Sequence, residues 1–465
     1  MKHVYVHTQA LCSTCMRKVQ ARIIAESGRV YLEKFCPEHR FSRTLLSTDV
    51  AWYEQSMSYI KPREYPLKSH TAEFAGCPES CGLCTEHQQH TCLPVIEITD
   101  RCDIDCPVCL KDFDDIDTLT TAEYRTIIDE LLASEKTVDV INLSGGEPTM
   151  HPDLENFIRY ALEKGVTQVS VSTNGLTLLR DANLRRLFRE TGTVVALQFD
   201  GFESSTYEKL RQQDMSQDKL RLIEIMEAEE VRYSLVTTVA KGINDVEISR
   251  IVDSFFESQA LSIMFQPVAF TGSASVMNVE SHRLTIPDVV REIEKSRYVK
   301  PGDFNPLPCS HYSCFALSYY LAAGDGTFHS LKDFLGFENY LQSIANKTLP
   351  GLDLEGMQRM KERMYEIWSA ADSSAVSENI LRRIKSVLCE LESCGYTRKN
   401  ALDVGMKNMK AVFIHHFMDI HNFDFGRIVK CCNPYAKKDG MLVPICSQNI
   451  FHIKERENLR VHSRG

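Results

Sequence analysis

Six short apolar runs, each followed by a stretch of helical periodicity, alternate along the middle of this chain. Repeated strand–helix units imply parallel strands, because each helix carries the chain back to the start of the next strand. The pattern therefore predicts an α/β domain whose six strands form a barrel or part-barrel. The predicted strands are Pro94–Thr99, Val138–Leu143, Gln168–Ser172, Val194–Phe199, Tyr233–Val239 and Ser262–Pro267.

Helical patterns lie between and after these strands. The first begins at a capping box, Thr120-Thr121-Ala122-Glu123, ahead of an apolar stretch. Others cover Pro152–Lys164, Asp181–Arg189, Ser216–Glu229 and Asp245–Glu257. Later in the chain, Leu381–Leu391 and Met409–Met418 are predicted as helices that are apolar on one face. That face either packs in the core or lines a channel for an alkyl chain.

Polar residues follow the ends of the predicted strands. In parallel α/β folds the chemistry lies at the carboxyl ends of the strands, so a ligand cavity is expected there. The first strand leads into a cysteine loop and the second into Gly145-Gly146-Glu147-Pro148. The third leads to Asn174, the fourth to Gln198 and Asp200, the fifth to Thr237-Thr238 and the sixth to Gln266-Pro267.

Seventeen cysteines, most of them closely spaced, are a second constraint. In a reducing compartment such spacing indicates metal or cluster ligands rather than disulfides. The group Cys102-x3-Cys106-x2-Cys109 supplies three thiolates, which leaves one iron of a 4Fe–4S cluster open to a substrate or cofactor. The group Cys77, Cys81, Cys84 and Cys92 suffices for a complete 4Fe–4S cluster, with a structural zinc site as the alternative.

Two further groups are less compact. Cys12, Cys15, Cys36 and His39 match a tetrahedral zinc or iron site, with a hairpin over Arg22–Leu32 that turns at Ser27-Gly28. Otherwise His39 is a surface residue and these cysteines are core residues. Near the C-terminus, one four-thiolate cluster is predicted from Cys309, Cys314, Cys446 and either Cys431 or Cys432. Cys389 and Cys394 are read as core or free thiols.

A Cys-x3-Cys-x2-Cys loop after the first strand, followed by Gly-Gly-Glu-Pro after the second, resembles the radical S-adenosylmethionine (SAM) enzymes. The resemblance implies that Cys102, Cys106 and Cys109 hold the catalytic 4Fe–4S cluster and that SAM binds its open iron. It also implies that Gly145, Gly146, Glu147 and Pro148 adjoin the methionine part of SAM, Glu147 through the ammonium. Asn174, Gln198 and Asp200 match positions that contact the ribose or carboxylate. Val108 stands where an aromatic residue is common.

Over nearly its whole length the chain resembles the group of the archaeal tetraether lipid synthase, whose members were also described as dihydropterin methyltransferases. That resemblance implies two auxiliary 4Fe–4S clusters and one mononuclear iron, with zinc possible because His39 replaces a cysteine. It divides the chain into a metal-knuckle domain (1–60), an auxiliary-cluster loop (61–93), the barrel (94–275) and a largely helical C-terminal domain (276–465).

Three functions follow from this reading. The first is a radical SAM enzyme that abstracts hydrogen from an unactivated carbon, of a lipid alkyl chain, and forms a C–C bond. The second is a radical SAM methyltransferase or maturase acting on a pterin or a peptide. The third is a non-catalytic iron–sulfur electron carrier, against which the Gly-Gly-Glu motif argues. A ferredoxin or flavodoxin is the expected electron donor.

Net charge and hydropathy limit the possible binding partners and the expected location of the protein. The net charge of −10 argues against nucleic-acid binding. The absence of a long apolar run and the polar start of the chain predict a cytoplasmic protein. The basic stretch Lys454–Arg464 is either a solvated tail or a peripheral contact with anionic lipid.

Overall fold

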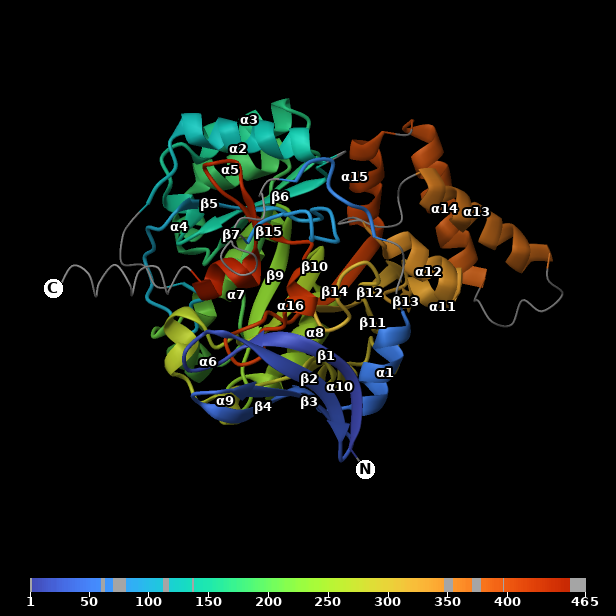
Figure 1. Ribbon diagram of the computed structural model, residues 1–465. Helices are drawn as coiled ribbons and strands as arrows, with labels where there is room; N and C mark the ends of the chain where they lie inside the picture. The colour runs from blue at the N-terminus through green and yellow to red at the C-terminus, as the bar shows by residue number, and fades with distance from the viewer. Residues whose placement is uncertain are drawn as a thin grey trace.

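A computed structural model describes residues 2–59, 63–69, 81–111, 117–135, 138–346, 354–369, 378–395 and 397–451. Its centre is a twelve-stranded sheet (Figure 1). Six of the strands are parallel neighbours in sequence order, as predicted. They are β5 (Val95–Thr99), β6 (Val140–Gly145), β7 (Gln168–Thr173), β8 (Val194–Gln198), β9 (Tyr233–Val239) and β10 (Ser262–Pro267).

The helices between these strands bury one face against the sheet. The predicted capping box forms at Thr120, whose hydroxyl accepts the Glu123 N–H at 3.3 Å while its own N–H donates to the Glu123 carboxylate at 2.8 Å. Under it, Tyr124 stacks on Phe157 with ring centroids 4.1 Å apart. The helices are α2 (Thr121–Ser134), α3 (Leu154–Glu163), α4 (Leu176–Arg180), α5 (Ala182–Thr191), α6 (Ser204–Arg211), α7 (Ser216–Ala228) and α8 (Ile248–Glu257).

The C-terminal third extends this sheet at both edges. Next to β10 lies β14 (Met409–His415), followed by β12 (Phe315–Ala322) with the short β11 (Asn305–Pro306) and β13 (Phe328–Ser330). On the other side, β15 (Pro434–Ala436) pairs with β5 and with β16 (Leu442–Pro444). The C-terminal segment is therefore part of the same sheet as the barrel.

The predicted helix over Met409–Met418 is wrong, because Met409–His415 is a strand. This strand pairs in parallel with β10 and antiparallel with β12, and Val412 and Ile414 are fully buried. A strand buried inside a sheet reads as a continuous apolar run, which periodicity cannot distinguish from a buried helix.

A helical layer stands beside β12 and β13 (Figure 1). It comprises α11 (Leu331–Leu335), α12 (Phe337–Ile344), α13 (Leu354–Ser369), α14 (Glu378–Ser393) and α15 (Arg398–Asn408). The predicted helix Leu381–Leu391 is confirmed as part of α14, and its apolar side chains Ile384 and Leu388 pack in a core with Phe334 and Leu341. Cys389 and Cys394 are exposed, so they are not core residues. No helix among the described residues is both long and apolar enough to cross a membrane.

The N-terminal segment is a four-stranded antiparallel sheet, called the ribbon below. Its strands are β1 (His3–Leu11), β2 (Lys18–Glu26), β3 (Arg29–Cys36) and β4 (Arg40–Ser47), followed by α1 (Val50–Ser58). The predicted hairpin at Ser27-Gly28 is confirmed. The ribbon contacts the C-terminal segment, where the Thr8 hydroxyl donates to Asp424 at 2.5 Å and the Lys34 ammonium donates to the His421 carbonyl at 2.9 Å.

A buried ion pair fixes the segment that follows β14. The Arg283 guanidinium donates to both Asp419 oxygens at 2.9 and 3.1 Å, and both side chains are almost fully buried. Asp419 also accepts the N–H groups of Phe270 at 3.3 Å and His421 at 2.9 Å. Since Phe270 lies just after β10, this carboxylate joins the barrel, the C-terminal segment and the ribbon contact.

Replacement of Asp419 by Ala is expected to lower the free energy of unfolding by about 3–5 kcal/mol, because it leaves a buried guanidinium without its anion. Denaturant or thermal unfolding measures the loss. The control is Arg159→Ala, which breaks the exposed Arg159–Glu155 pair and should cost at most about 1 kcal/mol. Equal effects of the two substitutions would show that Asp419 does not organise this region.

Candidate active site and metal centres

The predicted three-cysteine loop follows β5 and is partly buried. The Cys109 N–H donates to the Cys106 carbonyl at 3.0 Å, so the loop turns tightly at its end. Gly272 packs directly against the end of this loop. A Cβ at this position would lie only 2.5 Å from the Leu110 carbonyl carbon. Burial raises the pKa of the Cys102 thiol to about 11. Iron binds the thiolate and offsets that cost, so these three sulfurs fit a 4Fe–4S cluster that keeps one open iron.

The two glycines after β6 pack against the start of this loop. A Cβ on Gly145 would lie 2.1 Å from the Thr99 carbonyl oxygen, and one on Gly146 would lie 2.3 Å from that of Arg101. The Gly146 and Glu147 N–H groups donate to those same carbonyls at 2.7 Å each. Glycine is therefore required by the close approach of two chain segments. The predicted contact of the glycines with SAM stays a prediction.

Glu147 points inward rather than toward an open site. The residue is 1% exposed, and its carboxylate accepts the Thr149 N–H at 3.1 Å, the Thr149 hydroxyl at 2.6 Å, the Thr173 hydroxyl at 2.7 Å and the Asn174 N–H at 2.7 Å. Burial raises the pKa of this carboxyl, although the four donors oppose the shift. These contacts assign Glu147 the role of joining the ends of β6 and β7. A direct bond to the SAM ammonium gains no support from them.

Asn174, Gln198 and Asp200 come together in one hydrogen-bond network at the ends of β7 and β8. The Asn174 amide donates to Asp103 of the cysteine loop at 2.6 Å. The Gln198 amide donates to the Asp200 carboxylate, which also accepts the Thr238 N–H at 3.0 Å. The three predicted residues are thus tied to the cysteine loop and to the end of β9.

Two buried cations complete this network. The Arg211 guanidinium donates to Asp200 at 2.7 and 3.0 Å and contacts the Cys106 thiol. Lys219, which is 1% exposed, donates to the Gln198 carbonyl at 2.8 Å and to the Asn174 backbone carbonyl. Burial lowers the pKa of Lys219 to about 7. These contacts join Asp200, Gln198 and the end of β7 to the cysteine loop.

The sequence analysis did not identify these two cations. A signal existed for Lys219, because it lies on the buried side of α7 with Ser216, Leu222 and Met226. A lysine at an apolar position of a helical pattern is rarely fully buried unless it is paired or functional. Arg211 ends α6 among exposed polar neighbours, and nothing in its local sequence distinguishes it from a surface arginine.

The four predicted ligands of the N-terminal site converge. The sulfurs of Cys12, Cys15 and Cys36 and a ring nitrogen of His39 all lie within 4.8 Å of one another. The Cys36 and Cys12 sulfurs lie 3.6 and 3.7 Å from His39 Nδ1, and the Cys15 and Cys36 sulfurs lie 3.9 Å apart. Three thiolates and one imidazole at this spacing fit a tetrahedral metal ion.

The remaining cysteines divide differently from the prediction. Cys92 contacts Cys309 and Cys432, and its N–H donates to the Cys432 carbonyl at 2.8 Å. Cys314, Cys431 and Cys446 line a small cavity together with His415 and His416, and Cys432 reaches the same cavity. Cys309 and Cys314 thus belong to neighbouring groups rather than to one. Spacing along the sequence predicts which cysteines share a loop. It does not predict that the adjacent Cys431 and Cys432 contact different cysteines.

The structure describes two other members of the predicted second group. Cys81 and Cys84 lie on the loop where the Leu83 N–H donates to the Leu442 carbonyl at 2.9 Å. Cys77 lies outside the described residues. Another buried arginine, Arg427, reaches the second C-terminal group, where its Nε–H donates to the Cys314 sulfur at 3.1 Å.

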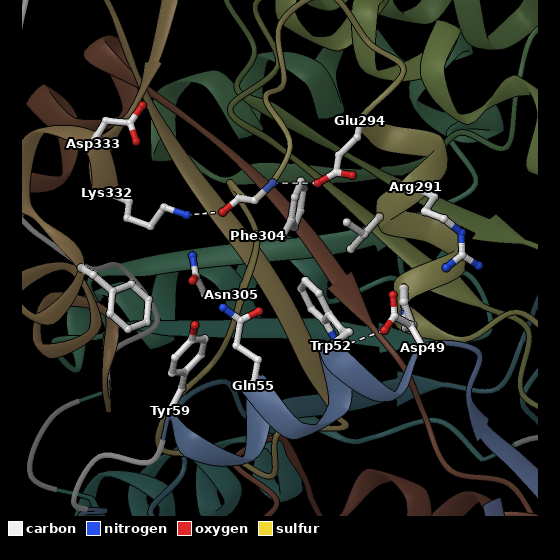
Figure 2. A pocket seen from close by; sticks show the side chains of 14 residues that line it. Asp49, Trp52, Gln55, Tyr59, Arg291, Glu294, Phe304, Asn305, Lys332 and Asp333 are labelled. Atoms are coloured by element: carbon white, nitrogen blue, oxygen red, sulfur yellow. Dashed lines mark hydrogen bonds between the residues drawn. The ribbon is translucent and has the colours of Figure 1, made fainter. Parts of the chain in front are cut away.

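The larger of the cavities described here, about 500 Å³, lies away from these cysteines. Figure 2 shows Trp52 and Gln55 of α1 and its cap residues Asp49 and Tyr59 pointing into it, with Lys332 and Asn305 opposite. Its other wall is α10 (Ile286–Ile293), extended by Glu294. None of its described lining residues belongs to the predicted site.

Comparison with known proteins supports the fold. The sequence matches the family models "Radical SAM superfamily" over residues 96–255 and "HMPTM N-terminal zinc ribbon domain" over residues 4–48. It is 28% identical to the 7,8-dihydro-6-hydroxymethylpterin dimethyltransferase of Methanocaldococcus jannaschii, over 97% of this chain and 94% of that protein.

Two more matches cover a smaller part of the chain. The Fe-coproporphyrin III synthase of Methanosarcina barkeri is 34% identical over 40% of this chain and 46% of its own length. The crystal structure of Streptococcus suis SuiB bound to the precursor peptide SuiA aligns with a TM-score of 0.39 and 15% identity, over 45% of this chain and 46% of that one. The two family models confirm the predicted radical SAM fold and the N-terminal metal ribbon.

Replacing Glu147 by Ala is expected to lower both the stability and the affinity for SAM while leaving the iron content unchanged. Four donors lose their acceptor, and each buried unsatisfied donor costs about 1–3 kcal/mol. Thermal unfolding, equilibrium dialysis with SAM and iron analysis measure the three effects. Glu208→Ala, at an exposed position on α6, is the control and should change none of them. Weaker SAM binding without any loss of stability would instead support a direct contact.

Proposed function

This chain belongs to the radical SAM superfamily, and we propose that it transfers methyl groups to a dihydropterin. The observation that carries the proposal is the match to the Methanocaldococcus jannaschii pterin dimethyltransferase, which extends over 97% of this chain. Such a match includes the ribbon, the barrel and the C-terminal cysteines, whereas the porphyrin-synthase match covers 40% of the chain. Agreement over all parts of a multi-part enzyme supports a shared substrate class better than agreement over the barrel alone.

The site residues have distinct tasks in this proposal. A 4Fe–4S cluster held by Cys102, Cys106 and Cys109 supplies the electron that cleaves SAM into methionine and a 5′-deoxyadenosyl radical. Arg211 and Lys219 would hold Asp200, Gln198 and the end of β7 in position beside the cysteine loop. Glu147 and the glycines before it fix the loop at the end of β6 against the cysteine loop. This rigidity keeps the reacting groups in position, which is the protein's main contribution to radical chemistry.

We further propose that the other cysteines hold auxiliary clusters. Thiolates are soft ligands that suit iron–sulfur clusters, and Cys92, Cys309, Cys432 and Cys446 are buried while Cys314 and Cys431 are partly buried. One cluster would use Cys92, Cys309 and Cys432, and another Cys314, Cys431 and Cys446. Cys81 and Cys84, with Cys77, remain candidates for either cluster. The ribbon ligands would hold zinc or iron, and the family model of that segment favours zinc.

An alkyl-chain substrate has less support. Of the two predicted helices offered as channel walls, Met409–His415 is an internal strand and the apolar side of α14 packs in the core. The electron-carrier alternative leaves the motif after β6 and the buried cations beside Cys106 without a purpose. Methyl transfer to a pterin is therefore the function that the site and the relatives support best.

The direct test is anaerobic incubation of the reconstituted protein with SAM, a reductant and 7,8-dihydro-6-hydroxymethylpterin. Mass spectrometry is expected to show methionine and 5′-deoxyadenosine from one SAM, S-adenosylhomocysteine from a second SAM that donates its methyl group, and a pterin heavier by one or two methyl groups. A Cys106→Ala variant should form neither product. A parallel reaction with extracted lipids tests the alternative substrate. Consumption of lipid, together with an unchanged pterin in the first reaction, would overturn the proposal.

The two C-terminal cysteine groups make a separate prediction. Cys309→Ser and Cys314→Ser should each reduce the iron content, by up to about four irons, and the losses should add in the double variant. If both residues bound one cluster, the double variant would lose no more iron than either single variant. The double variant is expected to cleave SAM without forming product, because the barrel residues alone complete the SAM site. Cys389→Ser, at an exposed thiol, is the matched control.

A further inference from the structure

The ribbon has a charge opposite to that of the rest of the chain. Residues 2–48 contain eight Lys and Arg against three Asp and Glu, a net charge of +5, whereas the whole chain carries −10. Ion pairs inside the ribbon join Glu33 to Lys2 and Arg22, Glu26 to Arg43, and Glu38 to Arg17, and they leave Lys18, Arg29, Lys34 and Arg40 outside these pairs. A basic module on an acidic body directs an acidic partner to one place.

Exposed aromatic residues lie at the metal end of the ribbon. Phe35 and Phe41 are 54% and 57% exposed and lie directly opposite each other on β3 and β4, so their side chains share one face. Phe35 precedes the ligand Cys36, and the exposed Arg40 follows the ligand His39. We call Arg17, Lys18, Phe35, Arg40 and Phe41 the ribbon tip. Aromatic residues and arginine are the types enriched in protein interfaces.

The inner side of the same site contacts the C-terminal segment. Ser13, next to the ligand Cys12, accepts a hydrogen bond of 2.8 Å from Lys34, which lies two residues before the ligand Cys36 and also donates to the His421 carbonyl. Three residues before His421, the Met418 N–H donates to the Cys446 sulfur at 3.2 Å. The metal end of the ribbon thus contacts the segment that bears on a C-terminal cysteine group, and Figure 1 shows its strands as an outer layer of the molecule.

We propose that the ribbon tip is the docking surface for an acidic one-electron donor protein. The inference rests on the proposed function, since each reductive cleavage of SAM consumes one electron, which the donor loses as the C5′–S bond breaks. A nucleic acid is the other obvious polyanion. It would extend beyond the ribbon over residues 49–465, which hold 45 Lys and Arg against 60 Asp and Glu and would repel it. A compact acidic protein meets only the basic face.

The experiment compares two reductants. SAM cleavage is followed as 5′-deoxyadenosine, with either reduced flavodoxin, an acidic protein, or dithionite as the electron source. In the double variant Arg17→Glu, Lys18→Glu the flavodoxin-supported rate is expected to fall about tenfold or more at low salt, as electrostatic steering is lost. The dithionite-supported rate should be unchanged. Phe41→Ser tests the apolar part of the surface and should also reduce only the flavodoxin-supported rate.

Controls separate docking from other effects. Arg186→Glu, an exposed charge reversal on α5, should leave both rates unchanged, and metal analysis verifies that the ribbon site of each variant is intact. In the wild type the flavodoxin-supported rate should decrease with ionic strength, and in the double variant it should not. Equal flavodoxin-supported rates in the wild type and the double variant would overturn the proposal.

The outcome is also distinguishable from a failure of the proposed function. If dithionite supports no SAM cleavage in any variant, the proposed function is wrong, and binding of oxidised flavodoxin, followed by analytical ultracentrifugation, still tests the docking surface. Binding that is lost in the double variant supports the proposal. A labelled single-stranded oligonucleotide that binds the tip and displaces flavodoxin would instead identify a nucleic-acid site.

Discussion

The close approach of the chain after β6 to the chain after β5 determines the geometry of the candidate site. Two backbone hydrogen bonds of 2.7 Å, from Gly146 and Glu147 to the Thr99 and Arg101 carbonyls, join the two loops. This contact exists only because Gly145 and Gly146 have no Cβ. The buried Glu147 carboxylate then binds the ends of β6 and β7 together. The three cysteines therefore start from a fixed anchor, and the loop that carries them has little freedom to move.

The sequence predicted those parts of the fold that repeat locally. All six parallel strands were located because each alternates with an amphipathic helix and ends in polar residues. The ribbon ligands were also predicted, since Cys12, Cys15, Cys36 and His39 come from one hairpin and its flanking turns. Local spacing is sufficient to predict a ligand set when all of its residues lie within about thirty residues of one another.

Features built by distant contacts could not be predicted in the same way. The strand Met409–His415 has no polar face, because it is inserted between β10 and β12. Cys92 joins Cys309 and Cys432 only after the C-terminal chain has returned to the β5 side of the sheet. Arg211 becomes a site residue only because the end of β8 presents Asp200 to it. In each case the contacting residue is distant in the sequence, so the local pattern of apolar and polar residues carries no information about it.

The cysteine groups also differ in the charge that surrounds them. A buried guanidinium contacts a cysteine sulfur in two of them, Arg211 at Cys106 and Arg427 at Cys314. Positive charge and hydrogen bonds to sulfur stabilise the more negative, reduced state of a cluster and so raise its reduction potential. Around Cys92, Cys309 and Cys432 the described charges differ: the Arg63 guanidinium donates to the Cys309 carbonyl at 2.8 Å, and the Glu135 carboxylate lies near Cys92. If these cysteine groups hold clusters, as proposed, Arg211 and Arg427 would raise the reduction potentials of the two clusters that they contact.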